Sequence, residues 1–165
     1  MDLRVKIQPK EIFIYSMYNF WAGMRGIGSI ILTVLVIIAA AASEERLGTQ
    51  VTNLVILGVI ALTGFQIFAI WKQAERTAGD AKTGAEIVFH IGDEGIRTRQ
   101  ANSKGEISWD KLVKVKKIAG IYVLYLDRDK AYLMPKRVFR GSEEQIFLSM
   151  LTRNLPQEKR RGIRA

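Results

Sequence analysis

Two clusters of basic side chains are the residues of this sequence best suited to chemistry, and the chemistry they suit is the binding of anions. The first cluster holds Lys111, Lys114, Lys116 and Lys117, and the second holds Lys136, Arg137 and Arg140. Each Lys or Arg held near an anionic membrane surface contributes about 1 kcal/mol of favourable binding free energy. We therefore interpret both clusters as contacts for anionic lipid or for a protein partner. The alternative, a solvated face that only follows the enrichment of cations in cytoplasmic segments, stays open.

Residues that could catalyse a reaction or hold a metal are sparse. His90 is the only histidine and the chain has no cysteine, so we expect neither a metal site nor a histidine-based catalytic triad. The segment 92–95 lacks the pattern of a phosphate loop. Carboxylates such as Asp93 and Asp110 lie in predicted turns, where Asp is common for structural reasons. We predict a binding protein that is not an enzyme and has no cofactor. No nucleic-acid-binding motif is recognised, so we predict no nucleic-acid partner.

Two uncharged apolar runs predict membrane-spanning helices. Residues 26–43 are 18 uncharged residues and residues 47–71 are 25 more. As helices these runs would extend about 27 Å and 38 Å, against a hydrocarbon core of roughly 30 Å. We predict transmembrane helices over 26–43 and 47–71, joined by an extracytoplasmic loop over 44–50. Neither run carries an ionisable residue, which argues against a stand-alone transporter or channel.

The distribution of cations predicts the orientation of this pair of helices. Arg25 precedes the first run, and Lys72, Arg76 and Lys82 follow the second, whereas the loop has one cation, Arg46. Because cytoplasmic flanks are enriched in Lys and Arg, both termini are predicted to be cytoplasmic.

Small residues recur along the predicted spans and favour close packing of helices in lipid. They are Ala22, Gly26, Ser29 and Thr33 around the first span and Gly58 and Ala61 in the second. Packing of the two helices on each other is one explanation, and a homo-oligomer or another membrane protein is the other. The second explanation carries an alternative function: an accessory subunit or immunity-type protector that acts through the transmembrane hairpin.

The remaining segments predict an α+β cytoplasmic domain. Leu3 to Ile7 alternate apolar and basic residues, as a half-buried strand does, and so short a strand must pair with another segment. We assign 1–10 to this N-terminal strand of the domain, 11–25 to an aromatic interfacial segment, 72–85 to a tether, 86–156 to the domain itself and 157–165 to a disordered basic tail.

Within 86–156 the pattern predicts an antiparallel sheet followed by one helix. We expect strands over 86–91, 95–100, about 106–118, 121–127 and 131–134, with a turn at 101–105. Pro135 indicates that the last strand ends there or lies at an edge. Ser142 and Gln145 predict a capping box at the start of the helix, which Pro156 ends.

Residues 107–139 resemble the YcxB-like family of bacterial membrane proteins. Trp109, the segment 121–126 and the run Pro135–Phe139 carry the resemblance, and the order of strand, aromatic segment, two spans and domain is similar as well. The resemblance implies a pleckstrin-homology-like (PH-like) sheet or barrel with a C-terminal helix, located at the bacterial inner (plasma) membrane. It implies no reaction, so it supports the architecture more than a function.

Overall fold

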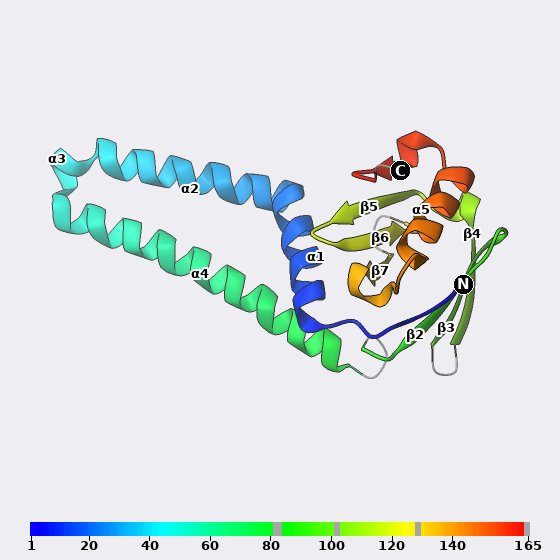
Figure 1. The fold of residues 1–165 in the computed structure, drawn as a ribbon. Helices are drawn as coiled ribbons and strands as arrows, with labels where there is room; N and C mark the ends of the chain where they lie inside the picture. The colour runs from blue at the N-terminus through cyan, green and yellow to red at the C-terminus, as the bar shows by residue number, and fades with distance from the viewer. Residues whose placement is uncertain (81–83, 101–102, 128–129, 164–165) are drawn as a thin grey trace. The chain divides into compact units, whose positions relative to one another are not determined.

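The structure is a computed structural model that describes residues 1–80, 84–100, 103–127 and 130–163. The chain divides into two compact units. One unit joins Met1–Ile12 to Thr77–Ala165, and the other is Phe13–Arg76. In Figure 1 the blue N-terminal segment can be followed into the sheet formed by the green strands. The two ends of the sequence therefore build one folding unit.

The helices that precede residue 80 are α1 (Pro9–Ala22), α2 (Met24–Ala42), the single turn α3 (Glu44–Leu47) and α4 (Thr49–Gly79). The predicted loop over 44–50 is thus mostly helical, and α4 continues to Gly79 through half of the predicted tether. No proline interrupts α4, which ends at Gly79.

One helix of the described chain is long and apolar enough to cross a membrane. In α4 an 18-residue window has a mean hydropathy of 2.3, and none of it is buried. The helix α2 counts as a second candidate only when joined to α1 across a bend of 64°. A side chain at Gly26 would clash with the carbonyl oxygen of Phe20 and lie 2.6 Å from the Cα of Trp21. Gly26 is therefore required for the close turn between α1 and α2.

The first sheet has the strand order β1-β2-β3-β4 and is antiparallel throughout. Its strands are β1 (Asp2–Val5), β2 (Ile87–Ile91), β3 (Gly95–Gln100) and β4 (Ser103–Ser108). The N-terminal strand pairs with β2 of its own chain, and Leu3 lies opposite Phe89. The predicted turn at 101–105 is too long, because β4 already begins at Ser103; residues 101 and 102 lie outside the described chain.

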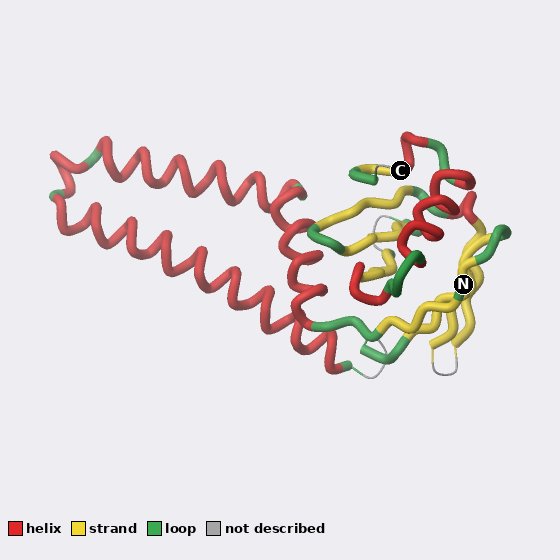
Figure 2. The backbone as a smooth tube through the Cα atoms, in the orientation of Figure 1, coloured by secondary structure: helices red, strands yellow, loops and turns green. Residues whose placement is uncertain are grey.

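The second sheet has the order β7-β6-β5-β8. It contains β5 (Lys114–Ile118), β6 (Ile121–Tyr125), β7 (Ala131–Pro135) and the two-residue strand β8 (Arg160–Arg161). Figure 2 shows these strands in yellow. Pro135 ends β7, an edge strand, as the sequence predicted. The prediction of a disordered tail is wrong at β8, because Arg160 and Arg161 pair in parallel with the otherwise open edge of β5.

The predicted strand over 106–118 is interrupted by a short 3-10 helix, η1 (Trp109–Lys111). The indole Nε1 of Trp109 donates to the carbonyl oxygens of Gly92 and Asp93 at 3.2 and 3.0 Å, which fixes this corner between the sheets. The two sheets remain separate in the described chain, so the α+β class is confirmed and a closed barrel is not formed.

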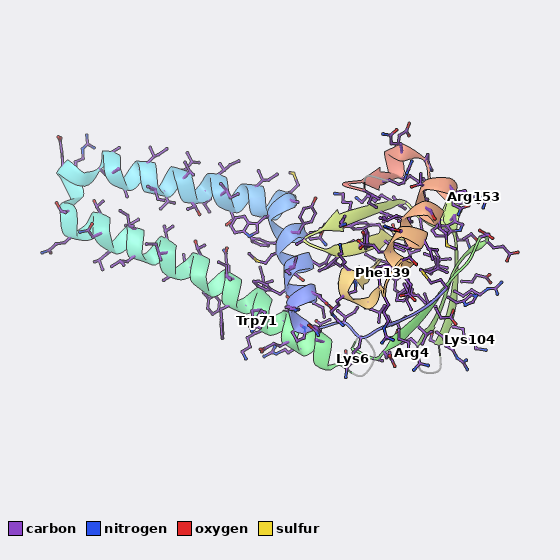
Figure 3. All side chains as sticks on the ribbon, viewed as in Figure 1. Arg4, Lys6, Trp71, Lys104, Phe139 and Arg153 are labelled. Atoms are coloured by element: carbon purple, nitrogen blue, oxygen red, sulfur yellow. The ribbon has the colours of Figure 1, made fainter. Side chains whose placement is uncertain are left out.

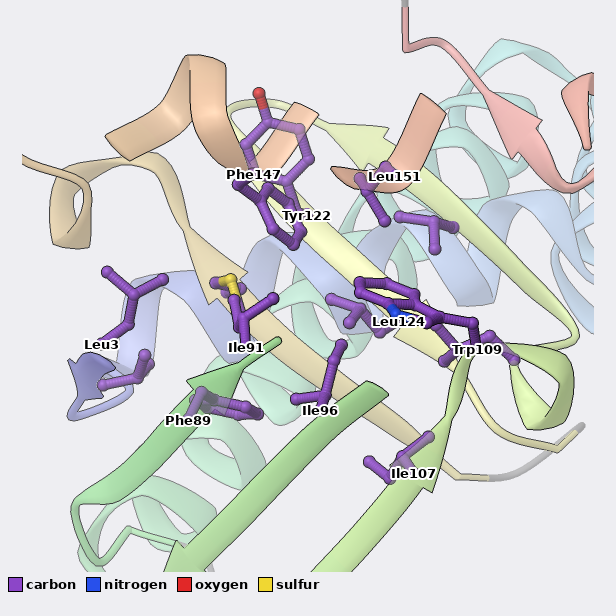
Figure 4. Packing of buried hydrophobic residues seen from close by; sticks show 14 of the residues in the cluster. Leu3, Phe89, Ile91, Ile96, Ile107, Trp109, Tyr122, Leu124, Phe147 and Leu151 are labelled. Atoms are coloured by element: carbon purple, nitrogen blue, oxygen red, sulfur yellow. The ribbon is translucent and has the colours of Figure 1, made fainter. Parts of the chain in front are cut away.

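The apolar faces of both sheets and the helix α5 (Glu143–Asn154) enclose one core. Figure 4 shows Leu3 and Phe89 from the first sheet, Leu124 from the second, and Phe147 and Leu151 from α5 turned toward one another. These side chains are at most 2% exposed. Leu3 and Phe89 occupy alternate positions of their strands, and Phe147 and Leu151 lie one helical turn apart on α5.

The predicted capping box of α5 is absent. Ser142 occupies the N-cap position but its side chain makes no capping hydrogen bond. The carboxylate of Glu143 instead accepts a hydrogen bond from the backbone N–H of Arg140 at 2.7 Å. A carboxylate in the first turn also interacts favourably with the helix dipole, so Glu143 stabilises this helix start.

Candidate functional site

The first predicted basic cluster is divided between different surfaces. On β5, successive residues point to opposite faces, so Lys114 and Lys116 lie on one face and Lys117 on the other. The ammonium of Lys114 lies 4.6 Å from the centre of the Tyr125 ring, a cation–π contact. Lys111 is exposed on η1. These four lysines do not form one anion-binding surface.

Glu144 on α5 engages two of the predicted lipid contacts, one from each cluster. The ammonium groups of Lys136 and Lys117 lie 3.1 and 3.5 Å from its carboxylate oxygens. The hydroxyl of Tyr122 donates to the same carboxylate at 2.6 Å. We refer to Lys117, Tyr122, Lys136 and Glu144 as the Glu144 cluster. It ties α5 to the second sheet.

The protonation of the Glu144 cluster follows from these contacts. The hydrogen bond from Tyr122, and then the nearby Lys136 and Lys117, hold the pKa of Glu144 below its ordinary value. Burial and the hydrogen bond to Glu144 raise the pKa of Tyr122. The pKa of Lys117 is raised, chiefly by the Tyr122 side chain. At neutral pH the two lysine charges are therefore partly balanced within the domain.

Arg137, from the second cluster, is bound to the N-terminal segment. It lies in η2 (Lys136–Val138), and its guanidinium donates to both carboxylate oxygens of Glu11 at 2.7 and 3.0 Å and to the carbonyl oxygen of Lys6 at 2.6 Å. The Glu11 side chain is 5% exposed, and it also accepts from the backbone N–H of Gln8. Arg137 thus holds the start of α1 to the domain. Arg140, three residues later, is exposed.

A different set of cations lies across the outer face of the first sheet. In register across the four strands stand Arg4, Val88, Arg99 and Lys104. The three charged side chains are exposed, and Figure 3 labels Arg4 on β1 and Lys104 on β4. No carboxylate of the described residues lies within ion-pair distance of them. We call Arg4, Arg99 and Lys104 the cationic row.

The next row along the same face contains side chains of both charges. It consists of Asp2, His90, Arg97 and Glu106, again in register across the strands. His90 contacts Asp2, and the Nε of Arg97 donates to Glu106 at 3.1 Å. A second contact joins Arg97 to Glu94 at 3.4 Å. We call this set the mixed row.

Residues of both rows, but not Arg4 at the end of the cationic row, line one groove of about 520 Å³ on the outer face of the sheet. Arg99, Lys104 and Val88 line it from the cationic row, and Arg97, His90 and Glu106 line it from the mixed row. Its volume falls in the range of small-molecule sites. The groove joins unpaired cations to a short apolar floor, which suits a phosphate attached to an uncharged group.

The cationic row was not predicted from the sequence, because its members lie up to a hundred residues apart in the chain. One sequence signal for an exposed basic face was present. In β1, and in β3 from Ile96 onward, charged and uncharged residues alternate, and Arg4, Arg97 and Arg99 are among the charged ones. The register that places Arg4 beside Val88 depends on pairing between the two ends of the chain, which the sequence does not fix.

The predicted helix-packing residues differ in their exposure to solvent. Ser29 and Thr33 of α2 are half-buried, as a packing face requires, and Ala22 is exposed at the end of α1. Gly58 and Ala61 are exposed on α4, and a side chain at Gly58 would meet nothing within 4 Å. The half-buried residues Val55, Val59 and Thr63 mark the other face of α4.

No group of three or more His, Asp or Glu side chains suited to a metal ion is found among the described residues. No match was found among curated proteins or among solved structures. The family comparison gives a match that begins at the end of β2 and continues into α5, and so covers most of the two-sheet domain without β1 or the helical unit. The resemblance seen in the sequence is confirmed over this segment: residues 91–151 match the family model of the YcxB-like protein.

Proposed function

We propose that this chain is a two-pass membrane protein of the bacterial inner membrane whose PH-like cytoplasmic module binds anionic lipid. It acts by binding and catalyses no reaction. A protein partner with acidic side chains is the competing ligand for the same basic surface. Both termini lie on the cytoplasmic side in this proposal.

The pairing of β1 with β2 is the observation that carries the proposal. β1 precedes the helical unit and β2 follows it, so the two ends of that unit must lie on the same side of any membrane. The chain between them can therefore cross only an even number of times. The unburied apolar window of α4 favours one crossing. An even number of crossings calls for a partner to α4, and we assign this second crossing to α2.

The charges support the predicted orientation. Lys72 and Arg76 lie near the end of α4, after the uncharged run 47–71, and the domain that follows is basic. Positive flanks face the cytoplasm. An anionic inner leaflet would attract this side of the protein.

Topology is tested by labelling single cysteines, which the cysteine-free chain makes straightforward. In intact cells, a membrane-impermeant maleimide should label Glu45→Cys and should label Ser142→Cys only after lysis. Labelling of Ser142→Cys but not of Glu45→Cys in intact cells would reverse the orientation. Equal labelling of both positions would place them on the same side and contradict a two-pass chain.

The ligand is tested by native mass spectrometry of the full-length chain, released with its surrounding lipids. Retention of anionic lipids at a defined stoichiometry supports the proposal. Retention of a protein at fixed stoichiometry, with no preference for anionic lipid, would replace it with partner docking.

A second candidate function is supported by the exposed face of α4. Gly58 and Ala61 leave this face open to another helix, as an accessory subunit or immunity-type protector would need. Gly58→Leu should then abolish co-purification of a membrane protein while leaving the domain folded. Unchanged co-purification would remove this candidate. Gly26→Leu is unsuitable for the test, because it would break the turn between α1 and α2.

A further inference from the structure

We infer that the cationic row binds the phosphate of an anionic phospholipid in the membrane that anchors the chain. The inference rests on the proposed membrane anchoring, and it names both the site and the bound group. The site is formed by Arg4, Arg99 and Lys104, with Val88 between the first two. None of these residues belongs to the basic clusters that the sequence suggested.

The register brings the three cations within reach of one phosphate. Neighbouring strands lie about 4.8 Å apart, so Arg99 and Lys104 stand side by side and Arg4 stands about 10 Å from Arg99. Long flexible side chains converge easily over such distances. Arginine in particular presents a fork of N–H donors that matches two phosphate oxygens.

The cations of the row have no competing carboxylate among the described residues, whereas their neighbours do. Arg97 lies two residues before Arg99, on the same strand and the same face. Its guanidinium contacts Glu106 and Glu94. Arg99 has no such partner, so its charge is available to an external anion.

The pairing of Arg99 with Lys104 is unfavourable for the sheet itself. The two residues are directly opposite on β3 and β4, and like charges in that position destabilise a strand pair. The mixed row shows the favourable arrangement at the next position along the same strands, with Arg97 opposite Glu106. A phosphate bound between Arg99 and Lys104 would remove the repulsion. Proteins commonly retain side-chain pairs that lower the stability of the fold at the sites where they bind ligands.

The chain connections favour a membrane lipid over a soluble anion. Four residues, Val5 to Gln8, separate Arg4 from the start of α1, and this stretch extends at most about 18 Å. Val88 is likewise the second residue of β2, the strand that follows α4. The cationic row is thus nearer along the chain to the helical unit than the mixed row is. The carboxylates Asp2 and Glu106 lie one row farther away.

The groove has room for a phospholipid headgroup. Its volume of about 520 Å³ exceeds that of a phosphate alone, and Val88 provides an apolar surface beneath the uncharged part of the ligand. The carboxylates of the mixed row would repel a second negative charge at the far end of the groove. A headgroup with one phosphate and a neutral glycerol therefore fits this distribution of charge.

The test measures lipid affinity of the full-length chain in neutral detergent micelles by native mass spectrometry. The probes are phosphatidylglycerol and phosphatidylcholine with the same acyl chains. The test variant is Arg4→Thr/Arg99→Thr/Lys104→Thr, since Thr is favourable in strands. The control variant, Lys111→Thr/Lys130→Thr/Arg153→Gln, removes the same charge from exposed positions that line neither the groove nor the cavity beside Arg4. Hydrogen exchange of the β2 amides checks that both variants are folded.

We expect the native chain to prefer phosphatidylglycerol, the test variant to lose roughly 100-fold in that affinity, and the control to lose less than about fivefold. If a folded test variant loses no more than the control, the site is wrong, although general binding of anionic lipid, and with it the proposed function, would stand. Equal affinity for both lipids would overturn both proposals.

A soluble ligand is tested separately with glycerol 3-phosphate. Binding of this compound that depends on the cationic row, without any preference for phosphatidylglycerol, would overturn the assignment to a membrane lipid. Weak or absent binding of glycerol 3-phosphate beside tight binding of phosphatidylglycerol supports it. Should the triple variant not fold, Lys104→Gln alone, at the edge strand, is expected to lower phosphatidylglycerol affinity about fivefold, and an unchanged affinity would overturn the site.

Discussion

Three of the basic residues singled out in the sequence and those of the cationic row differ in whether a carboxylate lies beside them. Lys117 and Lys136 contact Glu144, and Arg137 contacts Glu11, so these charges hold α5 and the N-terminal segment in place. Arg4, Arg99 and Lys104 contact no carboxylate of the described chain, and two of them face each other. A basic cluster in a sequence therefore does not reveal by itself whether its charges serve stability or binding.

The largest effect expected from this comparison is the loss of the Glu11–Arg137 pair. Arg137→Ala leaves a carboxylate that is only 5% exposed without its partner, and the cost should be about 2 kcal/mol of unfolding free energy. The value is set below that of a fully buried pair because Arg137 is 40% exposed.

Urea unfolding of the full-length chain in micelles measures this cost, with Trp21 and Trp71 replaced by Phe so that Trp109 alone reports on the domain. Arg140→Ala is the matched control, since that side chain is exposed, and it should change stability by less than about 0.5 kcal/mol. Equal losses for Arg137→Ala and Arg140→Ala would contradict a structural role for Arg137.

Glu144→Gln should remove about 1 kcal/mol at neutral pH, because the charged acceptor of Tyr122 and Lys136 is lost. The folded pKa of Glu144 is lowered, so its stabilisation is complete above the ordinary value of 4.5 and disappears as pH falls through the folded pKa. The same unfolding assay at several pH values should therefore show the native and Gln chains converging below 4.5. A gap that persists at low pH would mean that packing, not charge, is responsible.

The two arginines of β3 provide the most closely matched test of binding. Arg99→Thr should weaken phosphatidylglycerol affinity about fivefold, whereas Arg97→Thr should weaken it less than twofold, because Arg97 is already engaged by Glu106. Native mass spectrometry with the two single variants measures both. Losses of the same size would show that only the total charge of the sheet matters.

The smallest effect is a gain in stability. Lys104→Glu would place an acidic side chain opposite Arg99 and convert a repulsive pair into an attractive one, which should stabilise the domain by about 0.5 kcal/mol. The urea midpoint should rise while affinity for phosphatidylglycerol falls. A lower midpoint would argue that Lys104 has a structural role.

The α+β class and most strands could be predicted because alternation and turn residues are local signals. Ile121–Tyr125 and Gly95–Gln100 lie where the pattern placed them. The division of Lys114 and Lys117 between two faces also follows from alternation once β5 is bounded. The capping box failed because Ser142 satisfies a sequence pattern without making the bond, and Glu143 takes the role instead.

The partners of the cations could not be predicted. Glu11 and Arg137 are 126 residues apart, and nothing in either local segment indicates the other. The same is true of Arg4 beside Val88. Strand β8 pairs with β5 although Arg160 and Arg161 resemble a solvated tail, because the open edge of a sheet offers backbone partners irrespective of side-chain type.

The pairing of β1 with β2 also sets an order on synthesis. Val5 is made first, and its partner Ile87 emerges only after the whole helical unit. Before β2 is made, β1 has no strand to pair with. If β1 cannot reach β2 afterwards, β2 to β4 form a sheet with one open edge, which invites pairing with other chains. The domain is complete only in a chain whose helices have turned back to the starting side. If the proposed two-pass topology holds, the first sheet forms only in correctly inserted chains, and incorrectly inserted chains would leave the edge of β2 unpaired and open to proteases and chaperones.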